Sequence, residues 1–228
     1  MKLHRFYLPD VELRQKMWIH DEKLLHQWQH VLRYRVGQEL ALFDGERTER
    51  LYKIHKIAKD EVGLELVTEL VRKTPKKEIY LFWSLLKKDN NDWVLQKCTE
   101  LGVSHFVPIL PERKVATELN VERARKIVIE AAEQCGRSDI PRVREPIEIE
   151  TALNEFAGKL DLFYAEQSDD TETTIETNKP LGVFIGPEGG FTDAEKQLLD
   201  KNCKKLLLHD FTLRAETAAI VATTKLIQ

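Results

Sequence analysis

A buried-strand pattern that breaks abruptly into glycines is the feature that most constrains this chain. Leu181–Ile185 has the length and the β-favouring apolar composition of a buried strand, and Gly186-Pro-Glu-Gly-Gly190 follows at once. Thr192 and Glu195 have the spacing of a capping box, which opens a helix. The stretch predicts strand, glycine loop and helix, a unit that commonly holds a ligand at the carboxyl end of a strand in open α/β sheets.

The chain around this unit alternates between strand and helix patterns. Strand patterns occupy Ile79–Leu85, Val103–Ile109, Leu160–Ala165 and Lys205–Leu208. Helix patterns occupy Asp92–Leu101, Val121–Cys135, Thr151–Phe156 and Arg214–Ile227. This alternation predicts a mostly parallel sheet. We also expect the strands before the glycine loop and before the turn His209–Leu213 to be neighbours, so that the two loops line one pocket.

The first third of the chain has a different pattern. Asp21–Leu32 repeats apolar residues at helical spacing, whereas Val36–Gly45, Arg50–Ile57 and Glu61–Leu70 indicate strands and turns. The charged segment Arg72–Lys77 contains a proline and marks a boundary. We therefore predict a small β-barrel-like domain over residues 1–73 and an α/β domain over residues 74–228.

Charge and cysteine usage limit the classes of function. The net charge is −3, but residues 1–73 carry 14 Lys and Arg against 12 Asp and Glu, which permits a local basic face for nucleic acid. Cys98, Cys135 and Cys203 are odd in number and form no C-x-x-C, so we expect buried free thiols and no disulfide framework. No metal site is predicted, because no spaced His, Cys and carboxylate set occurs. Without a signal peptide or a long apolar run at the start, the expected location is the cytoplasm.

The glycine loop lacks the residues of the two common phosphate-binding motifs. Lys and Ser or Thr are missing after Gly190, which excludes a P-loop, and the dinucleotide fingerprint G-x-G-x-x-G is also missing. Such a loop suits a cofactor gripped by backbone amides and carbonyls, as an adenosine or methionine moiety would be. On the loop alone, a tight turn that binds no ligand remains an equal alternative.

Several motifs, in one order along the chain, resemble those of a known enzyme family. Gly186-Pro-Glu-Gly-Gly-Phe-Thr-Asp-Ala-Glu195 and Leu213-Arg-Ala-Glu-Thr-Ala218 resemble its two carboxyl-terminal signatures. Upstream, Gln96–Val103 and Glu130–Arg137 with Pro141 are similar to two further family motifs. In the first domain the similar residues are His4–Phe6, His30–Arg33, Gly37 and Asp44–Gly45. Taken together, these motifs resemble the RsmE family, the SPOUT-class enzymes that methylate N3 of a uridine in 16S ribosomal RNA. The resemblance covers nearly the whole chain.

The resemblance implies a fold, a cofactor and partners. It implies a PUA-like β-barrel domain that precedes a SPOUT-type α/β domain, whose mostly parallel sheet is knotted as a trefoil. It further implies S-adenosylmethionine as cofactor, 16S ribosomal RNA or the 30S subunit as partner, and a homodimer. This chain departs from the family pattern at His209, Phe211 and Ala215, where the family has Gly, Arg and Thr, and at Asn90, where it has Arg.

The resemblance and the chemistry together give candidate site residues. A guanidinium at Arg214 can act on the uracil oxygens, with Glu216 orienting it or a proton-carrying water. The alternatives are a salt bridge of Arg214 with Glu188 or Glu216, and stabilisation of the first helical turn by Glu216. The candidate cofactor-binding residues are Tyr164, Ala165, Glu166, Ile185, Gly186, Pro187, Glu188, Gly189, Gly190, Leu208, His209, Phe211 and Leu213. The candidate RNA-binding residues are Arg5, His30, Arg33, Arg35, Lys87 and Arg137, and a solvated basic face is the alternative for each.

Two other functions stay open at this point. A related RNA methyltransferase with another target would share most of these residues. A non-catalytic RNA-binding protein would keep the first domain and lose methyl transfer through the altered second loop. A test of cofactor binding distinguishes the non-catalytic protein from an enzyme. Mapping of the modified nucleotide distinguishes a methyltransferase with another target from one that acts on 16S ribosomal RNA.

Overall fold

The computed structural model describes residues 3–113, 116, 118–166, 175 and 178–228. Contacts within the chain divide it into two compact units, the first of residues 1–74 with 132–140 and the second of residues 75–131 with 141–228. The first break falls inside the charged segment Arg72–Lys77. Each unit has its own sheet.

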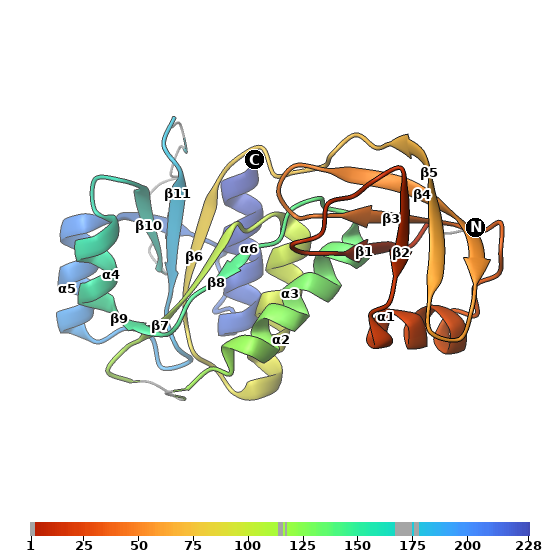
Figure 1. Ribbon diagram of the computed structural model, residues 1–228. Helices are drawn as coiled ribbons and strands as arrows, with labels where there is room; N and C mark the ends of the chain where they lie inside the picture. The colour runs from red at the N-terminus through yellow and green to blue at the C-terminus, as the bar shows by residue number, and fades with distance from the viewer. Residues whose placement is uncertain (1–2, 114–115, 117, 167–174, 176–177) are drawn as a thin grey trace. The chain divides into compact units, whose positions relative to one another are not determined.

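The first unit contains a five-stranded sheet in the order β1-β3-β4-β5-β2. Only the β1·β3 pair is parallel, and the other pairs are antiparallel. The strands are β1 (Arg5–Tyr7), β2 (Lys16–Ile19), β3 (Glu39–Phe43), β4 (Glu49–Ile57) and β5 (Val62–Glu69) (Figure 1). The predicted helix over Asp21–Leu32 is present as α1 (Glu22–His26), which continues into the π-helical turn η1 (Gln27–Val31). The small β domain predicted for this part of the chain is confirmed.

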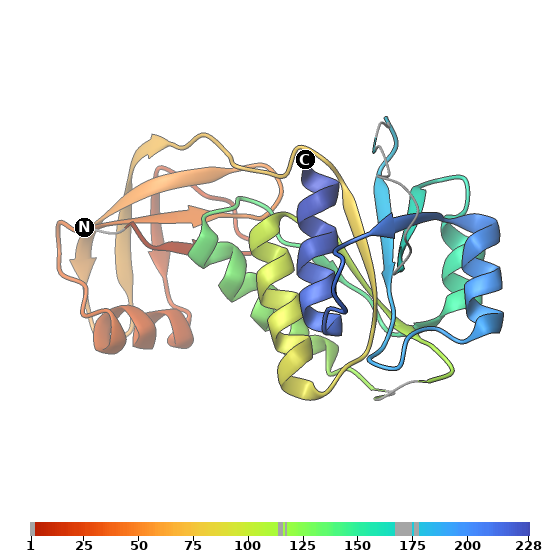
Figure 2. The ribbon, with the colours of Figure 1, turned by 180° about the vertical axis from the view of Figure 1, so that it is seen from behind.

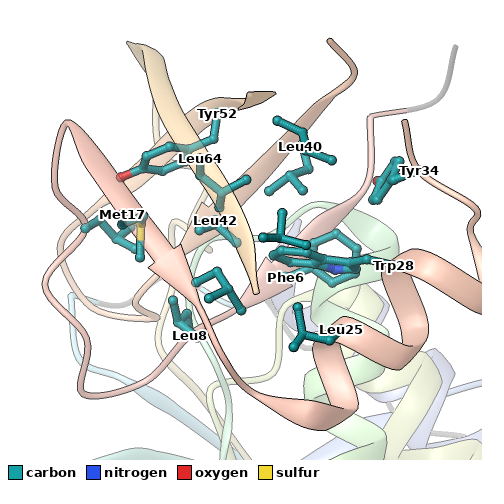
Figure 3. Packing of buried hydrophobic residues seen from close by; sticks show 14 residues of the cluster. Phe6, Leu8, Met17, Leu25, Trp28, Tyr34, Leu40, Leu42, Tyr52 and Leu64 are labelled. Atoms are coloured by element: carbon teal, nitrogen blue, oxygen red, sulfur yellow. The ribbon is translucent and has the colours of Figure 1, made fainter. Parts of the chain in front are cut away.

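The core of the first unit forms around Trp28, which η1 supplies. Its indole is wholly buried and meets Phe6 nearly edge-on, with ring centroids 5.2 Å apart. Leu40 and Leu42 of β3 and Tyr34 complete the same cluster (Figure 3). The helical segment therefore covers one face of the sheet because its periodic apolar side chains fill that face.

Residues 132–140 join the first unit through polar contacts that no sequence pattern announces. The backbone N–H of Tyr7 donates to Glu133 over 2.8 Å. Glu49, only 3% exposed, accepts from Arg5 over 3.0 Å and from the Ser138 hydroxyl. The backbone N–H of Lys73 donates in turn to the Ser138 hydroxyl over 2.7 Å. A buried carboxylate held by a guanidinium and a hydroxyl is thus a structural centre of this unit.

The second unit is a seven-stranded sheet in which every pairing is parallel. Its order is β12-β10-β11-β6-β7-β8, and β9 also pairs with β7. The strands are β6 (Ile79–Ser84), β7 (His105–Leu110), β8 (Arg142–Val143), β9 (Ile147–Glu148), β10 (Asp161–Glu166), β11 (Leu181–Ile185) and β12 (Lys204–Leu207). The predicted parallel sheet is confirmed.

Helices cover both faces of this sheet. The helices α4 (Ile149–Phe156) and α5 (Asp193–Asn202) lie on one face, and α2 (Lys88–Leu101) and α6 (Ala215–Ile227) lie side by side on the other (Figures 1 and 2). The remaining helix, α3 (Val121–Cys135), has the predicted bounds. Gly102 ends α2 with φ of 103°, a conformation that favours glycine and that its place after the helix predicts.

The strands β11 and β12 are not neighbours, contrary to the sequence-based expectation. β10 lies between them and pairs with both. After β12 the chain returns from the edge of the sheet, and α6 packs on β11, β6 and α2. Consecutive strands often pair, but here β12 adds to the far side of β10 and not to β11. The carboxyl end of β10 therefore lies between the two predicted loops.

The three cysteines are free, but they do not share one environment. Cys98 is buried, and burial raises the pKa of its thiol to about 12 although a hydrogen bond from Thr223 opposes the shift. Cys203 is partly buried, and Cys135 is exposed on the last turn of α3, so the prediction of a buried thiol is wrong for Cys135. None of the helices in the described ranges has the length and hydropathy of a membrane-spanning segment. Within the same ranges, no three His, Cys, Asp or Glu residues gather where they could hold a metal ion.

Candidate functional site

A cavity of about 510 Å³ lies at the carboxyl ends of β10, β11 and β12. It brings together all the residues predicted to bind the cofactor except Tyr164. The same cavity is also lined by Phe191, Lys196, Thr212, Arg214, Ala215 and Ala218. Carboxyl ends of parallel strands are where open α/β sheets hold ligands, because the connecting loops diverge there and leave a crevice.

The three glycines of the loop serve different purposes. Gly190 has φ of 68°, which a side chain would strain, and its N–H closes a turn onto the Pro187 carbonyl over 2.9 Å. A Cβ on Gly186 would lie 3.2 Å from the Phe191 ring. At Gly189 a Cβ would meet only the Cδ of Arg113, at an ordinary 3.7 Å. The fold therefore does not require a glycine at 189, a residue that lines the cavity.

Three contacts hold this loop in place. The buried Ser84 hydroxyl at the end of β6 donates to the Ile185 carbonyl over 3.0 Å, just before the loop. Arg113, after β7, donates from Nη1 to the Gly189 carbonyl over 3.0 Å, near the loop's tip. The third contact is the capping box of α5. Two backbone carbonyls at the loop, those of Ile185 and Gly189, thus accept hydrogen bonds from side chains.

The predicted capping box is confirmed and has an additional partner. Glu195 accepts from the Thr192 N–H over 2.8 Å, and the Thr192 hydroxyl accepts from the Glu195 N–H over 3.3 Å. The other carboxylate oxygen of Glu195 accepts from the backbone N–H of Glu112 over 2.7 Å. With Glu195 only 9% exposed, this carboxylate fastens the segment after β7 to the start of α5.

Charges on the cavity wall are partly compensated. The ammonium of Lys196 lies 3.0 Å from the carboxylate of Glu166, so these two lining residues form an ion pair. Arg214 also lines the cavity, with an exposed side chain. Among the described residues, its guanidinium has no hydrogen bond or ion pair, so the alternative salt bridges with Glu188 and Glu216 do not form there. Within the described part of the chain, the positive charge of Arg214 is therefore not neutralised by a carboxylate.

Arg214 is also the N-cap residue of α6. Its φ of −64° and ψ of 152° are extended, and its carbonyl accepts the first helical hydrogen bond from the Ala218 N–H over 2.8 Å. The amino terminus of a helix carries partial positive charge, so the backbone and the side chain add potential of the same sign at the cavity. Glu216 lies in the first turn of α6 and does not line the cavity. The structure thus separates the two residues predicted to be catalytic.

The turn after β12 presents two stacked aromatic rings. The rings of His209 and Phe211 lie 5.2 Å apart with an interplanar angle of 27°. The backbone N–H of Phe211 donates to His209 Nδ1 over 3.1 Å, which requires the tautomer with its proton on Nε2 when the ring is neutral. Both residues line the cavity, yet Phe211 is 74% exposed.

Tyr164 has a different environment from the other cofactor candidates. It is wholly buried on β10, and its hydroxyl donates a short hydrogen bond to Asp200. Burial first, and the Asp200 carboxylate next, raise the pKa of this phenol well above its usual range. The same hydrogen bond lowers the pKa of Asp200. Tyr164 therefore joins β10 to α5 beneath the cavity floor and is not part of its lining.

The residues predicted to bind RNA fall into two groups. His30, Arg33 and Arg35 are exposed at the end of η1 and in the loop that follows, and Lys87 is exposed at the N-cap of α2. Arg5 and Arg137 are held by carboxylates, Arg5 by Glu49 at 3.0 Å and Arg137 by Asp139 at 2.6 Å. In the first group, Arg33, Arg35 and Lys87 form no ion pair within the described part of the chain and can offer their charge to a phosphate, whereas the second group has a structural role within the first unit.

Sequence reasoning missed several residues around the cavity. Ser84, Glu112 and Arg113 follow or end β6 and β7, and a search of every carboxyl strand end for polar residues would have found them. Lys196 lies one helical turn after Thr192 on the predicted helix, so its approach to the loop could have been anticipated. The partner of Lys196 is Glu166, whose strand was not expected between the two loops.

Comparisons with known proteins agree with this arrangement. The family model described as an RNA methyltransferase domain matches residues 72–227, and the one described as an RNA methyltransferase PUA domain matches residues 29–67. The chain is 31% identical over 231 residues to the ribosomal RNA small subunit methyltransferase E of Rickettsia conorii, covering 97% of this chain and 94% of that protein. It is 36% identical over 176 residues to the protein of that name from Aquifex aeolicus, covering 74% and 76%. A crystal structure of the Neisseria gonorrhoeae protein of that name, bound to S-adenosylmethionine, superposes with a TM-score of 0.90 at 27% identity, covering 98% of this chain and 96% of that one.

Proposed function

The chain belongs to the ribosomal RNA small subunit methyltransferase E family, and from this membership we propose that it methylates N3 of a uridine in 16S ribosomal RNA with S-adenosylmethionine as methyl donor. The observation that carries the proposal is the cavity at the carboxyl ends of β10–β12, lined by the glycine loop and by Arg214, whose guanidinium has no partner among the described residues. A related RNA methyltransferase with another target and a non-catalytic RNA-binding protein are less well supported, because relatives of one name match most of the chain and the family models match both units.

The residues present fit S-adenosylmethionine. A volume of about 510 Å³ lies within the range of small-molecule pockets. The backbone of Gly186–Gly190 offers amides and carbonyls at close range, and Gly189 has no side chain where a ligand would meet it. Ala165, Leu208 and Leu213 give the wall apolar surface, and the Glu166 carboxylate is an acceptor for hydroxyl or ammonium groups. We propose that these residues hold the cofactor.

The reaction requires that the uracil be held in position and that its N3 become nucleophilic. When bound, the cofactor supplies an electrophilic methyl group on a sulfonium; the N3–CH3 bond forms as the S–CH3 bond breaks, leaving S-adenosylhomocysteine, and the N3 proton passes to water. Arg214 then has two tasks, to orient the uracil by its carbonyl oxygens and to stabilise the negative charge that spreads onto them as N3 loses its proton. The amino terminus of α6 reinforces the same charge. Glu216, away from the lining, acts on the reaction at most through Arg214 or a water.

Contacts with the ribosomal substrate are proposed for exposed basic side chains. His30, Arg33 and Arg35 of the first unit and Lys87 of the second are exposed and suited to phosphate oxygens. A 30S or 16S substrate places the protein in the cytoplasm. We further propose a homodimer, as the family resemblance implies, which sedimentation of the purified protein tests.

Two measurements test the proposed function. Calorimetric titration with S-adenosylmethionine should show one site per chain, and the non-catalytic alternative predicts no binding. Nucleoside mass spectrometry of ribosomal RNA from a strain lacking the protein should show loss of 3-methyluridine, with the modification restored by the wild-type chain. Loss of a different methylated nucleoside would establish the other-target alternative.

A further inference from the structure

We propose that Phe211, supported by His209, is a stacking platform for a nucleobase of the RNA substrate at the edge of the cofactor cavity. The inference rests on the proposed function and deepens it, since it assigns the contact that holds an unpaired base beside the methyl donor. Within the second unit Phe211 combines an exposed aromatic ring with a place on the cavity lining.

Exposure of the ring is the first observation. Phe211 is 74% exposed, whereas the other phenylalanine on the lining, Phe191, is 5% exposed and packs in the core. Leaving an aromatic ring in water forfeits the free energy that burial would provide, so a ring at a ligand cavity is favourable chiefly when a ligand covers it. One face of Phe211 has a partner in His209, the only ring in stacking contact with it among the described residues. The opposite face is available.

Preorganisation of the pair is the second observation. The backbone N–H of Phe211 donates a hydrogen bond to Nδ1 of His209, two residues earlier, and this bond fixes the histidine ring next to Phe211. With the rings 5.2 Å apart and inclined by only 27°, the platform exists before any ligand arrives. A preorganised aromatic surface loses little conformational entropy on binding.

A nucleobase suits this surface better than the other possible occupants. The methylated base has to leave its stack to reach the cofactor, which costs a few kcal/mol that a protein aromatic surface can offset. Every base has a π-face, so stacking does not need a hydrogen-bond code. Phe211 was predicted to bind the cofactor, but its ring is 74% exposed, whereas a bound small molecule is mostly enclosed, so we assign the ring to the base and not to the cofactor. Arg214, three residues on, supplies a charged group at the same wall for the polar edge of the base.

The test compares three substitutions at one position with the full-length protein. Phe211→Ala removes the ring, Phe211→Leu keeps apolar volume without a flat face, and Phe211→Trp keeps the flat face. We expect Phe211→Ala and Phe211→Leu to raise the Kd for a fluorescent oligouridine, and KM for ribosomal RNA, about five- to a hundred-fold. Phe211→Trp should restore both, while the calorimetric Kd for S-adenosylmethionine stays within two-fold in all three. Val71→Ala, at an 89% exposed apolar residue, is the matched control.

A double-mutant cycle separates the two rings. His209→Ala should weaken oligouridine binding in the wild-type background and have no further effect beside Phe211→Ala, because His209 acts through Phe211. Three results would overturn the proposal: equal RNA binding by Phe211→Leu and wild type, loss of cofactor affinity with RNA binding unchanged, or conversion of a dimer to a monomer by Phe211→Ala. The last two would assign the ring to the cofactor or to a second copy of the chain. Should the wild-type chain bind oligouridine but methylate no RNA, the proposed function would fail while the platform would still be tested by the binding data.

Discussion

The guanidinium of Arg113 donates a hydrogen bond to the carbonyl oxygen of Gly189, 3.0 Å away, across 76 positions of the chain. The contact joins the segment after β7 to the tip of the glycine loop, and the Cδ of Arg113 also lies 3.7 Å from the place a Gly189 Cβ would take. The neighbouring residue Glu112 is fastened to Glu195 at the start of α5. The loop on the cavity wall is therefore positioned by a strand end that does not itself line the cavity.

Arg113→Ala should weaken S-adenosylmethionine binding by about five-fold, the equivalent of one hydrogen bond of about 1 kcal/mol, because the loop must then be ordered by the ligand. Calorimetry measures the change in Kd. Arg123→Ala, which breaks a surface ion pair with Asp92 on another helix, should leave the Kd unchanged. Unaltered affinity in Arg113→Ala would show that the loop keeps its position without this contact.

Gly189→Val should abolish measurable S-adenosylmethionine binding while the protein stays folded. A side chain at this position meets only the flexible end of Arg113, and the backbone is not in the left-handed region that favours glycine, so the substitution strains nothing inside the chain. Because Gly189 lines the cavity, we expect the added methyl groups to take up space that the cofactor needs. Calorimetry and a thermal melt measure the two effects, and wild-type affinity in a folded variant would remove the loop from the cofactor site.

Local features of this fold were predictable from sequence, because their partners lie within one or two turns. Thr192 and Glu195 form the capping box that their spacing announces, and Gly102 closes α2 in the left-handed conformation that its place indicates. In both cases the physical requirement, an unpaired N–H or a positive φ, is local. The glycine loop and the turn at His209–Leu213 line one cavity as predicted, but β10 lies between their strands, so the expected pairing of those strands is not the reason.

The features that sequence reasoning missed depend on partners far along the chain. The place of β10 between β11 and β12 is decided by packing of the whole sheet, and no periodicity within one strand encodes it. Residues 132–140 join the first unit through Glu49 and Ser138, which lie 89 positions apart. The ion pair of Arg5 with Glu49 was missed for the same reason. Arg137 pairs with Asp139, only two positions away, and this pair was missed because an arginine that binds a carboxylate and one that binds a phosphate look alike in sequence.

Arg33→Glu combined with Arg35→Glu should weaken RNA binding and flatten its dependence on salt. Both side chains are exposed after η1, and phosphate contacts that are lost no longer release counterions. Filter binding of ribosomal RNA at several salt concentrations gives the slope, and S-adenosylmethionine affinity is the internal control. An unchanged slope would place the RNA surface elsewhere.

His105 should make the protein less stable as the pH falls below about 6.5, the ordinary pKa of the unfolded side chain. Burial against Tyr80, with ring centroids 3.9 Å apart, lowers the pKa of His105, and Arg142 and Arg144 lower it further, although Glu78 at 2.7 Å opposes the shift. The unfolded chain therefore binds the proton first, so stability is full above that pH and is lost as the pH falls towards the folded pKa.

Urea unfolding of His105→Gln between pH 7.5 and 5.5 should give a flatter pH dependence than the wild type shows. His20→Gln, at an exposed histidine, should follow the wild type. His105 lies at the amino end of β7, whereas the cavity lies at the carboxyl ends of β10, β11 and β12, so cofactor affinity should not respond. A parallel pH dependence in His105→Gln and wild type would show that other groups control acid stability.

Arg214→Ala should lower kcat by roughly ten- to a thousand-fold, the scale of removing one preorganised donor, with little change in cofactor affinity. If the guanidinium stabilises the uridine anion, its contact strengthens as N3 loses its proton, so its loss is felt in the transition state. Raising the pH should partly rescue the variant, because hydroxide then forms the anion that Arg214 no longer favours. Arg214→Lys should rescue only weakly, since an ammonium lacks the planar fork that meets a carbonyl edge.

A purely structural role for Arg214 predicts a different pattern, a lower melting temperature and a rate loss that does not respond to pH. The geometry argues against that role, because the exposed guanidinium has no partner among the described residues and α6 begins with a backbone hydrogen bond that alanine preserves. Single-turnover methylation against pH, with thermal melts of the same samples, separates the two roles. Arg125→Ala, at an exposed arginine of α3, should match the wild type in melting temperature and pH profile. A destabilised Arg214→Ala whose pH profile parallels that of the wild type would remove Arg214 from the methyl-transfer step.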